Sequence, residues 1–194
     1  MRILIISLLL LSNTNFSVNL EGSASMSLEK RLAKKVIPIN KNHEKRVIST
    51  LNKRMRKRET GEQWTKVNSL GYIGYYQFGK GALEATGYAH ITVKEFIKDP
   101  NIWPPKDQEQ AMNRLVKINT KLLNKYIEKY TGDTIKGIVV TKSGLLAAAH
   151  LAGAGSVKKR NGVIWFLCTK GTYDPEDAYG TKLSDYLSEF ANLD

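Results

Sequence analysis

A glutamate followed at fixed spacing by glycines and one glutamine is the pattern that most constrains the chemistry of this chain. Glu59 is followed by Gly71, Gly74 and Gln77, at distances of twelve, fifteen and eighteen residues. A carboxyl group can donate a proton to a glycosidic oxygen, which is otherwise a poor leaving group. A stretch rich in glycine is typical of a loop whose backbone approaches a ligand closely. The pattern therefore indicates one candidate catalytic acid and a loop that can hold a ligand against it.

The residues before the glutamate predict an amphipathic helix over 42–59. Its apolar positions share one face when successive residues are placed 100° apart, and they are Val47, Ile48, Leu51 and Met55. Glu59 continues this row. Burial and the negative end of a helix dipole both favour the protonated form of a carboxyl group, as a proton donor requires. The alternative is a surface glutamate paired with its cationic neighbours Arg54, Arg56, Lys57 and Arg58.

The pattern around Glu59 resembles the first motif of the soluble lytic transglycosylase and goose-type lysozyme superfamily. That motif is a Glu-Ser pair, an aromatic residue shortly afterwards, and then Ser-x-x-Gly-x-x-Gly-Leu-Met-Gln. Thr60 and Trp64 stand at or near the first positions of the motif here, Asn68 takes the serine position, and Tyr75 and Tyr76 replace Leu-Met. The resemblance extends over about residues 42–170.

Two further stretches carry the same resemblance in the same order. The sequence from Asp99 to Ile102 is similar to an element that precedes the long central helix of the family. The sequence from Leu146 to Val157 resembles the later Ala-Ala-Tyr-Asn-Ala-Gly-x-Gly-x-Val motif, which lies across the cleft from the acid. His150 and Leu151 occupy its Tyr-Asn positions, so the role of that asparagine does not carry over.

The resemblance implies a peptidoglycan lytic transglycosylase with Glu59 as its single catalytic acid and base. Such an enzyme cleaves the β-1,4 bond between N-acetylmuramic acid and N-acetylglucosamine, closes a 1,6-anhydro ring and uses no cofactor. The implied substrate-binding residues are Gly71, Tyr72, Gly74, Tyr76, Gln77 and His150. A core histidine bonded to a backbone carbonyl is the other interpretation of His150.

Two other functions stay open. A hydrolytic muramidase would act on the same bond with a second carboxylate, but between Glu59 and Asp99 the sequence offers only Glu62, Glu84 and Glu95. Glu62 is interpreted as a capping or solvated residue next to the acid. A non-catalytic protein that binds wall glycan or polyanions would not need Glu59 at all.

The predicted fold is mostly α-helical and lysozyme-like, with at most a minor β element. Short helices are expected over 82–87 and 92–98, a buried helix over 143–152, and further helices within 157–168 and 182–190. The strongest helix has its expected buried face at Ala111, Leu115, Ile118, Leu122 and Tyr126. Residues 135–141 are β-branched and predict either a short extended piece or a helix start.

The N-terminus predicts export. Residues 1–25 are predicted to be a signal peptide, with cleavage after Ser17 or Ser25. The basic Arg2 is followed by the apolar run 3–11 and then by the polar residues 12–17. A basic segment over 26–45 and a catalytic domain over 46–194 follow. The apolar run is too short to span a bilayer, and no transmembrane segment is expected in the mature chain. We therefore expect a secreted or periplasmic protein.

Charge and composition narrow the partners. The formal net charge is +12, from 30 Lys and Arg against 18 Asp and Glu. The expected partners are peptidoglycan glycan strands, together with anionic envelope polymers that contact the segment 26–45. Nucleic acid is not expected as a partner, because the positive charge is the one feature of the sequence that would support it.

The single cysteine, Cys168, excludes an intrachain disulfide and is predicted to be buried. The histidines show no metal-ligand spacing, so no metal site is predicted; they are His43, His90 and His150.

Overall fold

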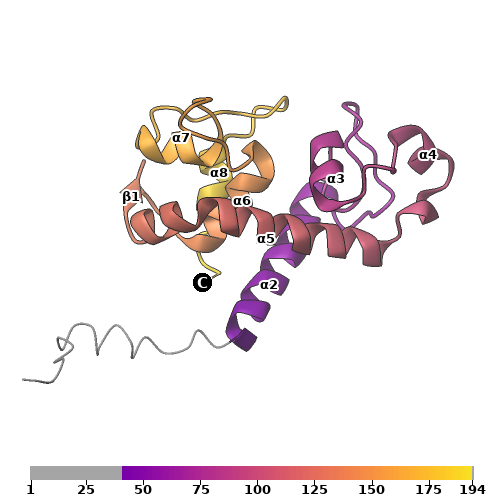
Figure 1. Cartoon of the computed structure of the whole chain (residues 1–194), viewed down its shortest axis with the longest axis horizontal. Coiled ribbons are helices and arrows are strands. Elements are labelled where there is room, and N and C mark those ends of the chain that lie inside the picture. Colours follow the sequence, from indigo (N-terminus) through magenta and orange to yellow (C-terminus); the bar gives the residue numbers. More distant parts are fainter. Residues whose placement is uncertain (1–40, 194) are drawn as a thin grey trace, which may run out of the picture. The chain divides into compact units, whose positions relative to one another are not determined.

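The structure, a computed structural model, describes residues 41–193 (Figure 1). The helices are α2 (Lys41–Thr60), α3 (Lys80–Thr86), α4 (Val93–Lys98), η1 (Pro100–Ile102, a 3-10 helix), α5 (Pro105–Tyr130), α6 (Lys142–Ala152), α7 (Gly162–Cys168) and α8 (Leu183–Glu189). Strands β1 (Thr134–Ile135) and β2 (Ile138–Val139) pair antiparallel in a small hairpin. The prediction of a mostly helical fold with a minor β element is confirmed.

The predicted N-terminal segments are only partly covered by the structure. The signal peptide over 1–25 and most of the basic segment lie outside the described residues. Residues 41–45, which the sequence assigned to the basic segment, belong to the first turns of α2. Within residues 41–193, no helix combines the length and the apolar character needed to cross a membrane.

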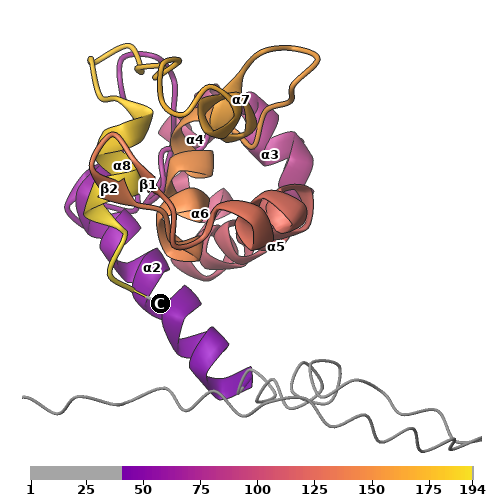
Figure 2. The same cartoon turned by 90° about the vertical axis from the view of Figure 1, so that its left-hand side faces the viewer.

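Helix α5 is the long element on which the others are arranged. Helices α3 and α4 lie over its first half, and α6, α7, α8 and the hairpin lie at its second half (Figure 1). Helix α2 packs against both α5 and α6, and Figure 2 shows it running past the end of α8. The loop over 61–79, which follows α2, therefore belongs to the first group of elements, while α6 and α8 belong to the second.

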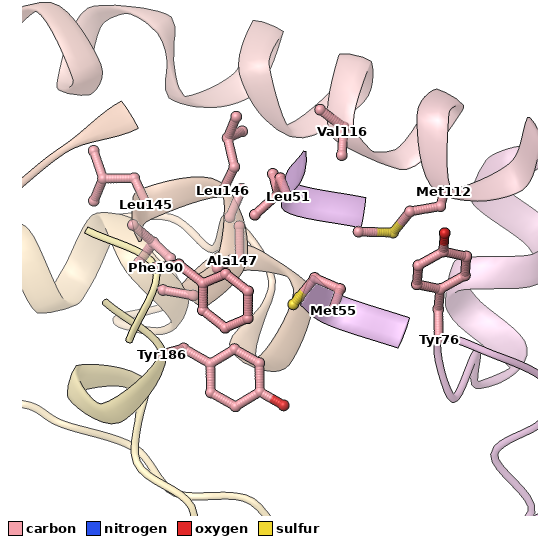
Figure 3. Close-up of a cluster of buried hydrophobic side chains, with 14 of the residues drawn as sticks. Leu51, Met55, Tyr76, Met112, Val116, Leu145, Leu146, Ala147, Tyr186 and Phe190 are labelled. Atoms are coloured by element: carbon pink, nitrogen blue, oxygen red, sulfur yellow. The ribbon is translucent and has the colours of Figure 1, made fainter. Parts of the chain in front are cut away.

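The core follows the same division. In the first group, the Trp103 ring contacts three other aromatic rings at centroid distances of 5.5 to 6.2 Å, namely Phe78, Tyr88 and Phe96. In the second, α2 supplies Leu51 and Met55 to a cluster with α5, α6 and the chain end at Phe190 (Figure 3). Because α2 buries its apolar row here, its last turn is fixed between the two groups.

Two expectations about burial are wrong. Leu122 was placed on the buried face of α5, but it is 55% exposed. The buried residues along this face of α5 are Gln108, Ala111, Met112, Val116, Asn119 and Leu123. Of the expected face, Ala111 is buried, and Leu115 and Tyr126 are partly buried against the core. The face is rotated because two polar residues, Gln108 and Asn119, are buried within it, and an apolar count cannot include them. Cys168 was expected to be buried but is exposed. It is the last residue of α7, whose buried face is formed by residues that include Phe166 and Leu167.

Candidate active site

Glu59 lies in the last turn of α2, at the point where the chain leaves the helix. Gly61 has a φ of +60° and Glu62 a φ of +69°, so the helix cannot continue. The buried Thr60 hydroxyl donates to the carbonyl of Tyr75 at 3.2 Å. Lys66 donates to the Glu59 carbonyl at 3.4 Å. These bonds hold the end of α2 against the following loop and fix the position from which the Glu59 side chain projects.

One oxygen of the Glu59 carboxyl group is held by protein and the other is not. The Tyr186 hydroxyl donates a hydrogen bond to Oε1, and His150 Nε2 lies 3.9 Å from the same atom. Within residues 41–193, no hydrogen bond reaches Oε2. The side chain is 15% exposed. The arrangement leaves Oε2 as the oxygen that can exchange a proton with a bound molecule.

The cations near Glu59 in sequence have other partners. Arg54 donates to the carbonyl of Glu189 at 2.8 Å, Arg56 forms an ion pair with Glu109, and Arg58 lies 3.0 Å from the Glu189 carboxylate. Among the described residues, no lysine or arginine forms an ion pair with Glu59. The alternative of a surface glutamate neutralised by its neighbours is therefore not what the structure contains.

Tyr186 is the residue that sequence reasoning missed most clearly, because it lies 127 positions after Glu59. Its ring stacks on Phe190 at 5.8 Å, and Figure 3 shows its hydroxyl directed away from that ring. Burial raises the pKa of the Tyr186 hydroxyl far above its usual value, and the charge of Glu59 adds to the effect. Tyr186 therefore stays protonated at neutral pH and acts as a fixed donor to the acid.

His150 is bonded to a backbone carbonyl, and it also lines the cleft, while its role in substrate binding stays a prediction. Its Nε2 lies 2.8 Å from the carbonyl of Tyr76, and a carbonyl only accepts, so Nε2 carries the proton. Its Nδ1 is buried without a hydrogen-bond partner in the described part of the chain. The side chain is 8% exposed, yet it forms part of the cleft wall. It links α6 to the loop after the acid.

A tight turn presents Tyr72 at the mouth of the cleft. Asn68, at the motif's serine position, accepts hydrogen bonds on Oδ1 from the backbone amides of Leu70 and Tyr72, both at 2.9 Å. Gly71 has a φ of +80°, in the left-handed region that favours glycine. The Tyr72 side chain is exposed. The asparagine therefore performs the local turn chemistry of a short polar side chain, and the glycine allows the turn to close.

Gln108 of α5 holds this loop from beneath. It is fully buried; its Oε1 accepts from the Tyr75 amide at 2.7 Å, and its Nε2 donates to the carbonyls of Trp64 at 3.0 Å and Trp103 at 2.8 Å. A Cβ on Gly74 would come within 2.5 Å of the same Oε1. Gly74 is thus required because the loop lies directly on Gln108.

The remaining predicted substrate residues divide between the core and the cleft. Tyr76 is completely buried, so it meets the site only through its carbonyl, which His150 contacts. Gln77 lines the cleft, but its Nε2 donates to the carbonyl of Gly74 at 3.0 Å. The structure therefore brings Glu59, Tyr72, Gln77 and His150 together at the cleft, whereas Gly74 lies on the inner side of the loop against Gln108 and the Tyr76 side chain is in the core.

The cleft beside Glu59 has a volume of about 240 Å³. A hollow of about 230 Å³ shares Tyr72, Gln77 and His150 with it, and another of about 230 Å³ shares Leu151 and Asp177. Glu59 lines the central hollow of the three. Consecutive hollows with shared walls form a path past the acid, which suits an extended polymer better than a compact ligand.

A second carboxylate, Asp177, lies in the same cleft. Its Oδ1 accepts from the amides of Tyr179 at 2.8 Å and Thr181 at 2.9 Å, which fixes its orientation. The sequence search for a partner acid covered only the residues between Glu59 and Asp99. It therefore missed Asp177, which the loop before α8 brings to the site. The exposed Tyr179 belongs to the same loop and bonds across the mouth to Ser69 at 3.0 Å.

The loop that carries Asp177 is anchored by Asp174. This carboxylate accepts from the Ser184 amide at 3.0 Å, from the Ser184 hydroxyl at 2.7 Å and from Lys136 at 2.6 Å. Burial alone would raise the pKa of Asp174, but these bonds outweigh it and hold the pKa below its usual value. Asp174 is therefore ionised at neutral pH and ties the loop to the start of α8 and to the hairpin.

Comparisons of the chain with protein-family models, with curated proteins and with solved structures found no match.

Proposed function

We propose that this chain is a peptidoglycan lytic transglycosylase, secreted or periplasmic, that cleaves the bond between N-acetylmuramic acid and N-acetylglucosamine. The observation that carries the proposal is the Glu59 carboxyl group, with Oε1 held by Tyr186 and Oε2 left to the cleft. The resemblance of the residues after Glu59 to the transglycosylase motif supports the same assignment. A protein that only bound glycan would have no use for an acid held in this way.

The proposed reaction needs one acid that acts twice. Glu59 protonates the glycosidic oxygen as the bond from that oxygen to the muramyl C1 breaks. The carboxylate then takes the proton of the muramyl 6-hydroxyl as O6 bonds to C1 and closes the 1,6-anhydro ring. The oxygen of the substrate N-acetyl group assists by stabilising C1 between the two steps. The proton returns to Glu59, and no water is consumed.

The walls of the cleft suit this substrate. Tyr72 and Tyr179 are exposed at its mouth, and flat rings with a polar tip fit the apolar faces and hydroxyl groups of sugars. The hollows on both sides of the central cleft provide room for sugar units before and after the cleaved bond. The fixed loop around Gln108 keeps these surfaces in register with the acid.

A hydrolytic muramidase is the second candidate, and Asp177 is the observation that favours it. A second carboxyl group in the same cleft can activate a water molecule or stabilise a positively charged sugar, as two-carboxylate glycosidases do. In that case, water rather than the 6-hydroxyl attacks C1, and the product is a reducing sugar end.

Product analysis tests the proposal. Purified protein is incubated with purified peptidoglycan, and the released muropeptides are identified by mass spectrometry. We expect 1,6-anhydromuramyl ends, with Asp177→Asn retaining the same products and at least a third of the parent rate. Reducing ends, together with a loss of about 100-fold or more in Asp177→Asn, would assign the hydrolase instead. The absence of any released muropeptide would overturn both.

A further inference from the structure

A larger groove lies between α2 and α5, and the Glu59 site does not use it. Its volume is about 1210 Å³. The residues of α2 that line it are Glu44, Lys45, Ile48, Ser49, Asn52, Lys53 and Arg56. Those of α5 are Glu109, Asn113, Val116, Lys117, Thr120, Lys121 and Asn124. The groove thus takes in the part of α2 that precedes Glu59.

The charges in this groove are unbalanced. Lys45, Lys53, Lys117 and Lys121 form no ion pair with any other residue of the range 41–193. The carboxylates of the groove are neutralised, since Glu44 lies 2.8 Å from Lys142 and Glu109 pairs with Arg56. The groove therefore presents a net positive surface, which attracts a negatively charged molecule.

Polar atoms in the wall of the groove lack partners. Asn52 is 4% exposed, and its Nδ2 donates to Asn113 at 2.9 Å, but its Oδ1 has no hydrogen-bond partner in the described part of the chain. The buried Nε of Arg56 has none there either. A buried polar group without a hydrogen-bond partner is unfavourable. A ligand that brings both hydroxyl donors and anionic acceptors would satisfy these atoms.

The groove suits a long ligand with repeated charges. At 1.5 Å per residue, Lys45 and Lys53 are separated by roughly 12 Å along α2, and Lys117 and Lys121 by roughly 6 Å along α5. The bonds from Asn52 to Asn113 and from Arg56 to Glu109 join the helices at one end. Figures 1 and 2 both show the first turns of α2 diverging from α5. The groove is thus open toward Lys45.

We propose that the groove between α2 and α5 binds a linear polyol phosphate polymer, a chain of phosphate groups joined by hydroxyl-bearing units. The lysines would contact the phosphates, and Asn52 and Asn113 the hydroxyl groups. The chain's own segment 26–40 is a poor occupant, since it carries Lys30, Arg31, Lys34 and Lys35 against Glu29 alone. Among the described residues, no aromatic side chain lines the groove, whereas proteins that bind single-stranded nucleic acid stack its bases on aromatic rings.

Fluorescence anisotropy with labelled poly(glycerol phosphate) and the full chain tests this binding separately from glycan cleavage. The double variant Lys117→Glu/Lys121→Glu should bind more than about tenfold more weakly, because it removes phosphate contacts. The control Lys158→Glu/Lys159→Glu makes the same change of charge at exposed positions outside the groove and should stay within about threefold of the parent. Equal losses in the two variants would mean that net charge alone drives binding, and would overturn the proposal.

Two further measurements distinguish the ligand class and the binding surface. Asn52→Leu should weaken binding of poly(glycerol phosphate) but not of inorganic polyphosphate, which has no hydroxyl groups along its chain. A preference for a single-stranded oligonucleotide over poly(glycerol phosphate) would overturn the ligand class. A loss of binding in Lys34→Glu/Lys35→Glu equal to that of the groove variant would assign the polymer to the basic segment and overturn the proposed site.

Discussion

Helix α2 contributes to two hollows of opposite chemistry. Its last turn places Glu59 in a cleft of about 240 Å³ with exposed tyrosines at the mouth. Its earlier turns form one wall of a groove of about 1210 Å³ that contains unpaired lysines. Around the cleft, Arg54, Arg56 and Arg58 have partners, while two carboxyl groups, Glu59 and Asp177, line the ligand space. In the groove, the carboxylates have partners and the cations face it.

This contrast shows that hollow size does not identify the chemical site. The larger groove has no unpaired carboxyl group among its lining residues, because Glu44 and Glu109 are both in ion pairs. The smaller cleft has an acid with one oxygen fixed and the other accessible. The placement of charges, rather than volume, is therefore the basis on which we propose proton transfer in the cleft and polyanion binding in the groove.

The largest effect should come from removing the support of the cleft loop. Gln108→Leu leaves the Tyr75 amide and the carbonyls of Trp64 and Trp103 without their buried partner. We expect a loss of about 3–5 kcal/mol in the free energy of unfolding, measured with urea. Gln110→Leu, at an exposed position of the same helix, should change it by less than about 0.5 kcal/mol. Equal losses would contradict the role given to Gln108.

The next largest effect concerns Asp174, and it depends on pH. Because the folded pKa of Asp174 is lowered, its contribution is complete above the unfolded pKa and is lost as pH falls through the folded value. Asp174→Asn should cost about 2 kcal/mol at pH 7. The stability difference between parent and variant should begin to shrink as pH falls below about 4, and it should disappear below the folded pKa. A difference that persists unchanged at pH 3 would show that charge is not its source.

Tyr186→Phe tests the contact that holds the acid. Removing the hydroxyl leaves Oε1 of Glu59 without its donor, so the carboxyl group is less well oriented. We expect kcat for peptidoglycan cleavage to fall about tenfold with KM nearly unchanged, since the loss is one of positioning. Tyr179→Phe, at the mouth of the cleft, should affect KM more than kcat. If Tyr186→Phe changed mainly KM and Tyr179→Phe mainly kcat, the role given to Tyr186 would be wrong.

The smallest effect is expected at the start of the groove. The hydrogen bond and the charge of Lys142 lower the pKa of Glu44, so its contribution also disappears as pH falls, by the same linkage as for Asp174. The pair is partly exposed and screened by solvent. Glu44→Gln should therefore change stability at pH 7 by less than about 0.5 kcal/mol. If Glu44→Gln lowered the free energy of unfolding as much as Asp174→Asn, the distinction between the mostly buried Asp174 side chain and the partly exposed Glu44 side chain would be wrong.

The sequence predicted those features that depend on local patterns. The row of Leu51 and Met55 placed Glu59 at the end of a helical face, and the structure has it there. The β-branched composition of residues 135–141 leaves a short extended piece and a helix start both open, and in the structure the hairpin ends at Val139 and α6 begins at Lys142. Periodicity was sufficient for α2, because that helix buries a face that its own apolar residues define.

Contacts between distant segments could not be predicted in this way. Tyr186 contacts Glu59, and Asp177 lines the cleft, only because α8 and the loop before it fold back to the last turn of α2. Gln108 was missed because it is a polar residue on the buried face of α5, and an apolar pattern excludes it. No local rule connects these residues to Glu59. Their positions depend on tertiary packing, which a single sequence does not display.

The central claim is that Glu59 is the proton donor for glycan cleavage. The most direct test is the rate at which purified Glu59→Gln releases muropeptides from peptidoglycan, compared with the parent protein. Glutamine retains the size of the side chain and an oxygen that can accept from Tyr186, so the fold and the melting temperature should be preserved. We expect the rate to fall by about 100-fold or more. A folded Glu59→Gln variant that releases muropeptides at the parental rate would contradict the account.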